Sequence, residues 1–349
     1  MNNITPVDPS LLKEIRASVK FAERHGDTEL IKQTAASLSN YQPTTVSTMN
    51  GIGYMQGGFI GSQLLPEIVA SPDGQEQASF PVFGKEFFFS ADDVVAIGGS
   101  VKRTDLAITW TKKTLDVHSK HAYLDAREQR AASAVGIDIA AQKVDLVRSQ
   151  VQTRKEVLAA TLLTTDGTYS SSTYYGTLSG TNQWSHASSA PLTAIEAKKE
   201  VVRAAIGVRP NVLWLSPTAY TALRFNAQII GVVNGGATKQ NPAAPVGAEV
   251  LAAILGLTVF VGDAVYTSAV GGASSDIWND CAGLLYVGGA ELMSPKFGAT
   301  FTAGGYPKVD QFRDETQGAE GSDVYRYSEC YKHICTLNTA GYLWHDVTA

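Results

Sequence analysis

Cys330, His333 and Cys335 are the residues whose types and spacing come nearest to a metal site in this chain. Thiolates and imidazoles are common zinc ligands, but a structural zinc site needs a full tetrahedral set, and the sequence offers no second ligand pair with suitable spacing. Residues 328–344 around them alternate in polarity as a β-strand does. We therefore interpret these residues as part of a strand and predict no metal site.

Two other groups of residues could also suggest chemistry. His118 and His121 lie three positions apart, yet two histidines need further metal ligands and none is nearby. Asp92 and Asp93 form an acidic pair in a turn-like stretch, which is typical of a solvated turn. Because the chain has 3 cysteines, an odd and sparse number, a disulfide framework is not indicated.

Two glycine-rich stretches resemble nucleotide-binding loops in composition only. Residues 51–57 have the wrong glycine spacing for a dinucleotide-binding turn, and no helix opens there. The later stretch, with Asn234, Gly235, Gly236 and Lys239, lacks the residue order of a phosphate-binding loop. Nucleophile-elbow and metalloprotease motifs are missing as well. We predict no catalytic, cofactor-binding or metal-binding residues, and hence a protein that is not an enzyme.

The composition is that of a folded protein with a modest charge. Of the 349 residues 44% are hydrophobic and 17% are charged, and the formal net charge is -5. This charge gives no basic footprint for tight nucleic-acid binding, and no apolar run approaches the roughly 20 residues that span a membrane. The first residues lack the order of a secretory signal. A low charged fraction fits a protein that covers much of its surface with copies of itself.

The element around which the chain is organised is a long helix predicted over residues 137–163. Ile137, Val144, Val151 and Leu158 recur every seventh position, while charged residues, including Glu156, take other faces. The surrounding chain has the pattern of strands rather than of partner helices. We therefore interpret this helix as a rigid spine that carries strand-rich elements.

The segments on both sides of this helix lack a core of their own. Residues 1–50 contain two short helical patterns and a polar stretch, which together indicate an arm. Residues 75–122 show no helix pattern and form either a small β domain or a projecting two-stranded ribbon. Because an isolated ribbon is marginal in water, we expect it to lie on another chain. Residues 166–191 are a loop, and Tyr174, Tyr175 and Trp184 suggest that it is pinned at some contact.

Residues 192–287 alternate between helices and short buried strands, which predicts a compact sheet with helices on its faces. Thr193 and Glu196 form a capping box for the first helix, and Pro217 begins another that runs through Ile230. Residues 290–349 return to strands. We expect these to close a second, discontinuous domain beside the spine.

A cluster of five phenylalanines in the 75–122 region, which begins at Phe80 and ends at Phe89, is the main candidate for an interface. It either packs within one domain or is buried against a neighbouring subunit, since exposed aromatic clusters mark interfaces. We interpret Lys85 as an exposed lysine in a hairpin. The candidate contact residues in this region are Phe83, Lys85, Phe87, Phe88, Phe89 and Trp110.

In the order of these elements the chain resembles the major capsid proteins of tailed bacteriophages with the HK97-type fold. The resemblance covers nearly the whole chain and is most specific at residues 211–223, N-V-L-W-L-S-P-x-A-Y-x-A-L. It implies an α+β fold divided as follows: an N-terminal arm at 1–50, a peripheral-domain strand segment at 51–74, an extended loop at 75–122, the spine helix and following loop at 123–191, an axial domain at 192–289 and peripheral-domain strands at 290–349.

The resemblance also implies a function, which is that of a shell subunit. Pentamers and hexamers would build an icosahedral head around double-stranded DNA, with loop 231–246 lining the capsomer axis through Asn234, Gly235, Gly236 and Lys239. The implied partners are further copies of the chain, a separate scaffolding protein, a portal, and packaged DNA through non-specific contacts, with no membrane. The implied location is the virion, after assembly in the host bacterial cytoplasm. Some relatives cross-link a loop lysine to an asparagine, but no asparagine here can be matched to Lys85.

Two alternatives remain open at this stage. An encapsulin-like shell of a cellular nanocompartment would share every feature above, and packaged DNA would separate the two. A soluble α/β enzyme built on residues 192–287 would need a pocket with converging titratable groups. The size of the particles would separate a shell protein from such an enzyme.

Overall fold

The computed structural model describes residues 57–71, 73–83, 90, 93–95, 97–101, 108–135, 138–233 and 246–349. The predicted arm and eight candidate contact residues lie outside these ranges: Lys85, Phe87, Phe88, Phe89, Asn234, Gly235, Gly236 and Lys239. Phe83 ends a strand, but its side chain is not described. Of the ten candidates, only Trp110 can therefore be placed by its side chain.

The spine helix predicted from the sequence is confirmed as α5, Ile139–Thr164. It begins where the Asp138 carboxylate accepts a hydrogen bond from the Ala141 amide at 3.2 Å. The predicted seven-residue stripe is wrong in detail, because the buried side of the helix changes along its length. Val147 and Val151 pack on a sheet beside Tyr327. Farther along, the buried residues belong to another core: Ala159, Ala160 and Leu163.

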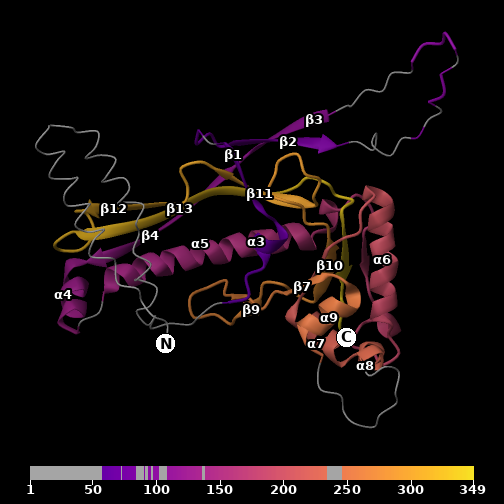
Figure 1. The fold of residues 1–349 in the computed structure, drawn as a ribbon. Helices are drawn as coiled ribbons and strands as arrows, with labels where there is room; N and C mark the ends of the chain where they lie inside the picture. The colour runs from indigo at the N-terminus through magenta and orange to yellow at the C-terminus, as the bar shows by residue number, and fades with distance from the viewer. Residues whose placement is uncertain are drawn as a thin grey trace, which may run out of the picture. The chain divides into compact units, whose positions relative to one another are not determined.

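One sheet, called here the peripheral sheet, runs along the spine (Figure 1). Its longest strand is β13, Ser322–Cys335, which confirms the strand predicted around Cys330. One edge of β13 pairs with β4, Asp116–Asp125. The other edge pairs first with β12, Lys308–Asp314, and farther along β13 with β11, Gly298–Ala303. Strand β11 also pairs in parallel with β1, Glu67–Ser71. Residues 116–122 thus belong to this sheet rather than to the extended loop.

The extended loop begins as a two-stranded ribbon, one of the two forms predicted. Strand β2, Gln77–Phe83, pairs antiparallel with β3, Ile108–Thr114. Phe80 points into the body of its own chain and stacks on Phe301 with ring centroids 5.5 Å apart. For this phenylalanine, packing within one chain is therefore the correct interpretation.

The second sheet, called here the axial sheet, has the strand order β5-β14-β10-β6-β7. The predicted strands are confirmed as β6, β7 and β10, whose bounds are Val212–Leu215, Thr258–Val261 and Cys281–Leu285. Two further strands were not expected here: β5, Tyr175–Thr177, and β14, Gly341–His345. Strand β14 contributes Trp344 to the core of this sheet, where its ring centroid lies 5.6 Å from that of Trp184. The same contact pins the 166–191 loop, as predicted.

Helices cover one face of the axial sheet, and two local predictions about them fail. Helix α6, Pro191–Ile206, has Ala190 as its N-cap, so Thr193 is not the cap. Proline starts this helix because its missing N–H costs nothing at the first position. The helix predicted from Pro217 is broken at Asn226, whose buried side-chain amide donates to the Trp184 carbonyl at 3.0 Å. The remaining elements are α3 Gly61–Leu64, α4 Ala126–Val135, α7 Pro217–Phe225, α8 Ala227–Val233, α9 Ala248–Leu255, β8 Val265–Tyr266 and β9 Ser275–Asp276.

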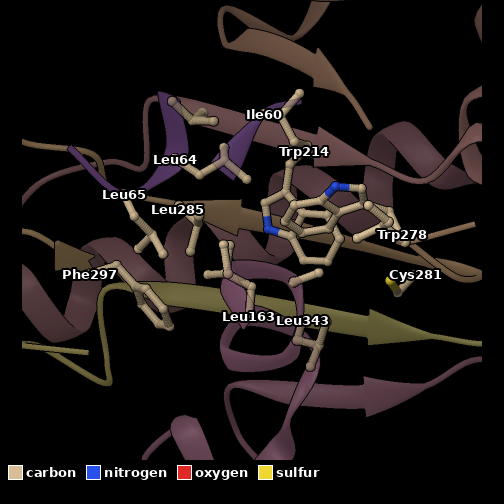
Figure 2. Close-up of a cluster of buried hydrophobic side chains, with 14 of the residues drawn as sticks. Ile60, Leu64, Leu65, Leu163, Trp214, Trp278, Cys281, Leu285, Phe297 and Leu343 are labelled. Carbon is tan, nitrogen blue, oxygen red and sulfur yellow. The ribbon is translucent and has the colours of Figure 1, made fainter. Parts of the chain in front are cut away.

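A single core joins the spine to the other face of the axial sheet. Figure 2 shows Leu163 of the spine among side chains of β6, β10 and β14. Ile60 and Leu64 belong to the same cluster. Trp214 and Trp278 pack against each other there, with ring centroids 5.0 Å apart. Three segments distant in sequence therefore share one apolar interior.

We predict that Leu163→Ala lowers the free energy of unfolding by about 2 to 5 kcal/mol, because this fully buried side chain leaves a cavity. Leu146→Ala on the same helix should cost less than about 0.5 kcal/mol, since Leu146 is 51% exposed. Urea denaturation of unassembled subunits measures both. Equal losses for the two variants would contradict this description of the core.

Candidate assembly surface and the joint behind it

Glu156 is the most unusual residue of the spine, because its carboxylate is buried. Its Oε1 atom accepts hydrogen bonds from the Ile60 amide at 2.8 Å and the Gly61 amide at 3.0 Å. The same atom accepts from Trp278 Nε1 at 3.0 Å, and Oε2 accepts from the Gly61 amide at 2.9 Å. One carboxylate thus binds the start of α3 and the loop before β10 to the spine. We call this group the Glu156 joint.

The spacing of apolar residues after Glu156 indicates that Glu156 is buried, although the seven-residue pattern placed it on a polar face. Glu156 was assigned to a polar face, yet Ala159, Ala160 and Leu163 follow it at the spacing that places residues on one side of a helix. Gly61 is the complementary position. A Cβ atom there would lie 2.6 Å from Oε2 of Glu156 and 2.9 Å from Cβ of Ala159, so a larger residue would displace the carboxylate or the spine.

Burial raises the pKa of Glu156, although the bonds from Ile60, Gly61 and Trp278 oppose that shift. The neighbouring residue behaves in the opposite way. Burial alone would lower the pKa of Lys155, but the hydrogen bond to Glu67 and the charge of Glu329 outweigh it and raise the pKa. Lys155 Nζ lies 2.6 Å from Glu67 and 3.2 Å from Glu329. It thereby ties the spine to β1 and β13.

His333 also serves the structure rather than any chemistry. Its Nε2 lies 3.1 Å from the Lys155 carbonyl oxygen and its Nδ1 lies 2.9 Å from Thr300 Oγ1, so both ring nitrogens are occupied. Burial lowers the pKa of His333 to about 4 and raises that of the Cys335 thiol to about 12. Neither group is available as a base or nucleophile at neutral pH. In the described part of the chain, no three His, Cys, Asp or Glu side chains are grouped to hold a metal.

The outer side of the ribbon offers apolar surface to solvent. Trp110 is 53% exposed, whereas Phe80 on the paired strand is buried. The described residues of β3 that follow Trp110 include Lys112 and Lys113, both exposed. Among the described residues, β3 pairs only with β2, which leaves its other edge without a strand. An exposed tryptophan beside an open strand edge is a surface suited to contact with another chain.

A groove of about 1030 Å³ lies beneath the ribbon. Val82 and Lys113 line it from the ribbon, and Val208, Met293, Lys332 and Leu337 line it from the body. Val208 is 46% exposed and Met293 is 51% exposed, so apolar side chains face an open space. Both lysines give this space a positive rim. We call it the ribbon groove.

No helix in the described ranges is long and apolar enough to cross a membrane. The exposed side of the ribbon, the ribbon groove and the Glu156 joint together form the candidate site. Its possible chemistry is non-covalent contact: apolar burial, strand pairing and charge pairing.

We predict that Glu156→Ala destabilises the unassembled subunit by at least about 2 kcal/mol, because each buried N–H donor left unpaired costs about 1 to 3 kcal/mol. Asp145→Ala, at an exposed position on the same helix, should change stability by less than about 0.5 kcal/mol. Chemical denaturation measures the two. A Glu156→Ala subunit as stable as the wild type would show that the joint does not hold the body together.

His333 should make the unassembled subunit sensitive to acid. A histidine with a lowered pKa contributes stability above its ordinary pKa of 6.5, and this contribution is lost as the pH falls through about 4. At about 1.4 kcal/mol per pH unit, the loss is on the order of 3 kcal/mol. We expect His333→Gln to remove this part of the pH dependence, measured by denaturation between pH 7 and pH 4, and the exposed His186→Gln to leave it unchanged. Identical profiles for wild type and His333→Gln would contradict the assignment.

Comparison with known proteins gives a curated relative and several solved structures, while no protein-family model matches the sequence. The relative is the major capsid protein of Burkholderia phage BcepMu, 28% identical over 307 residues, or 85% of this chain and 94% of that protein. A phage-related protein from Bordetella bronchiseptica RB50 has a similar structure with a TM-score of 0.65 and 24% identity, covering 87% of this chain and 96% of the other.

Two further structures share the fold at low identity. The capsid structure of cyanophage P-SCSP1u aligns with a TM-score of 0.56 and 12% identity, over 85% of this chain and 91% of the other. The SrpI encapsulin of Synechococcus elongatus PCC 7942 aligns with a TM-score of 0.51 and 11% identity, over 89% and 95%. The resemblance predicted from the sequence is thereby confirmed: the chain has the HK97-type fold and is similar to the major capsid proteins of tailed phages.

Proposed function

We propose that this chain is a major capsid protein, whose copies assemble through pentamers and hexamers into an icosahedral head that encloses a double-stranded DNA genome. The observation that carries the proposal is the similarity to the BcepMu major capsid protein, which extends over 85% of this chain. The HK97-type fold, with its spine helix, ribbon and axial sheet, supports it.

The physical reason for self-association lies in the ribbon. A two-stranded ribbon is marginally stable by itself. Here it carries an exposed Trp110 and an edge of β3 that pairs with no strand in the part of the chain that the structure describes. A second copy can cover both. Many such contacts, each modest, hold a shell firmly because the subunits are multivalent.

The proposal also includes the domain division, contact residues and partners that the sequence resemblance implies. The division into arm, extended loop, peripheral domain and axial domain is part of the proposal, with β5 and β14 added to the axial sheet. Loop 231–246 would line the capsomer axis, and Lys85 and the phenylalanines beyond β2 would contact a neighbour. A separate scaffolding protein, a portal and the packaged DNA would be the other partners, with assembly in the host cytoplasm and the virion as the final location.

An encapsulin-like nanocompartment shell is the second candidate, and the likeness to the SrpI encapsulin favours it. Its lower sequence identity makes it the weaker candidate. An enzyme built on the axial sheet has less support, because burial raises the pKa of the Cys281 thiol on β10 to about 12, so this thiol is not a nucleophile at neutral pH.

Imaging and sizing the purified protein tests the function. We expect capsomers or closed particles, and particles from infected cells that contain DNA. Closed particles that hold only protein cargo would favour the nanocompartment, and a small closed oligomer at all concentrations would overturn both shell functions.

We predict that Trp110→Glu abolishes or strongly reduces assembly while the subunit remains folded, because a charge replaces an exposed apolar contact. Phe80→Ala, on the facing strand, should instead lower the subunit's stability by about 3 to 5 kcal/mol, since Phe80 is buried. Sedimentation measures assembly and circular dichroism measures folding. Wild-type assembly of Trp110→Glu would exclude this residue from the interface.

A further inference from the structure

Strand β12 forms an edge of the peripheral sheet (Figure 1). Among the described residues it pairs with β13 alone, so its second edge has no partner strand there. Its 7 residues are all exposed or half-buried, and two of them are large and apolar: Val309 is 43% exposed and Phe312 is 44% exposed. The unpaired backbone groups of an edge strand are a template for pairing with another chain.

The order of the charges along β12 favours pairing with a second copy. Charged side chains on an edge strand often prevent contact with other chains. Here, however, the sequence K-V-D-Q-F-R-D is complementary to itself when two copies run antiparallel with Gln311 opposite Gln311. Lys308 of each copy then faces Asp314 of the other copy. Residues directly opposite each other share a face of the sheet, so this register forms two pairs of opposite charges.

Neighbouring registers bring like charges together. With Asp310 at the centre, Asp310 would face Asp310, and with Phe312 at the centre, Asp310 would face Asp314. Like charges directly opposite each other destabilise a pair of strands. In the register centred on Gln311, the two Phe312 side chains are instead diagonal neighbours on one face, within reach of each other. This register therefore covers the exposed aromatic ring and pairs the charges.

Contacts within one chain leave the charges at both ends of β12 available. The Lys308 side chain is 60% exposed, and its partner Asp310 at 3.3 Å also binds Arg326 at 2.8 Å. Asp314 accepts two hydrogen bonds at Oδ1, from the Thr316 amide at 2.9 Å and the Thr316 hydroxyl at 2.6 Å. These bonds lower the pKa of Asp314, so its carboxylate is charged at neutral pH.

We propose that β12 pairs antiparallel with β12 of a second copy across a two-fold axis at Gln311, which joins two peripheral sheets into one. This inference rests on the proposed shell function and adds to it a specific contact. The contact is isologous, because the same strand serves both copies, whereas the contacts that close a ring of subunits are head-to-tail. It would therefore link subunits of neighbouring capsomers.

Symmetric cross-linking tests this register. Gln311→Cys is exposed and would place the thiols of two copies opposite each other, with Cβ atoms about 4.5 to 5.5 Å apart. We expect assembled shells of this variant to give a covalent dimer with a short bis-maleimide. Native Cys281 and Cys330 are buried and Cys335 is half-buried, so the background is measured on the wild type.

Val309→Cys is the matched control on the same strand. In the proposed register Val309 faces Arg313, so two Val309 positions are about 14 Å apart along the strands at 3.4 Å per residue. This variant should give no dimer above background. Shells without the Gln311 dimer, or with as much Val309 dimer, would overturn the contact while leaving the shell function standing. Failure of the wild type to assemble would instead overturn the shell function.

A mixed pair covers the case in which Gln311→Cys does not fold or assemble. Val309→Cys in one preparation and Arg313→Cys in another place their thiols opposite each other only in this register. The two are mixed, assembled and cross-linked, and we expect a dimer containing one copy of each variant. Assembled mixtures that give no mixed dimer would equally reject the contact.

Charge reversal separates pairing between copies from effects within one chain. In the Gln311→Cys background, Lys308→Glu would face Asp314 of the second copy, and we expect it to abolish most of the cross-link. Adding Asp314→Lys recreates two opposite pairs between the copies and should restore the cross-link, although it cannot restore the Lys308–Asp310 pair within the chain. An unchanged yield for Lys308→Glu, or no recovery in a folded double variant, would contradict the proposed register.

Discussion

The carboxylate of Glu156 is the constraint on which the rest of the structure depends. It is buried, and its two oxygens accept hydrogen bonds from Ile60, Gly61 and Trp278. These donors come from segments 96, 95 and 122 residues away in the sequence. Because a buried carboxylate needs all its hydrogen bonds, the start of α3, the spine and the loop before β10 are held in one arrangement. The tryptophans and Leu163 then pack around that arrangement.

The body and the ribbon differ in how far their apolar side chains and hydrogen-bonding groups find partners within the same chain. In the body, charged residues such as Lys155 find partners within the chain, and the axial sheet is buried on both faces. Along the ribbon, Trp110 is exposed, and within the described ranges no strand pairs with the second edge of β3. In the proposed shell, other copies of the chain would cover this exposed part of the ribbon. This division suits a shell, where rigid units must meet through adaptable contacts.

Part of this structure could be predicted from the sequence because the signals were local. The spine helix follows from its periodicity, and β6, β7 and β10 follow from short apolar runs next to glycine, proline or asparagine. Alternation without helix signals indicated strands between residues 75 and 122, but left open whether they form a ribbon or a small β domain. The fold as a whole required the resemblance in element order, since local patterns do not determine which strands pair.

The failures concern long-range pairing and competing local signals. Strand β14 pairs with β10, although the three strands before it in sequence belong to the peripheral sheet, and no local pattern encodes that choice. Thr193 has the residue type of a cap, but Pro191 already starts the helix. Glu156 was assigned to a polar face because charge usually indicates exposure. Only its spacing to Ala159, Ala160 and Leu163 indicated otherwise.

Hydrogen exchange on the same protein before and after assembly tests the central claim most directly. The claim is that the body is held by contacts within one chain, whereas the ribbon needs contacts with other copies. The account predicts that the Ile60 and Gly61 amides, bonded to Glu156, exchange slowly in free subunits and in shells alike. It predicts that those amides of residues 108–114 that do not bond to β2 exchange rapidly in free subunits and become protected only in shells. Equal protection of those ribbon amides in free subunits would contradict the account.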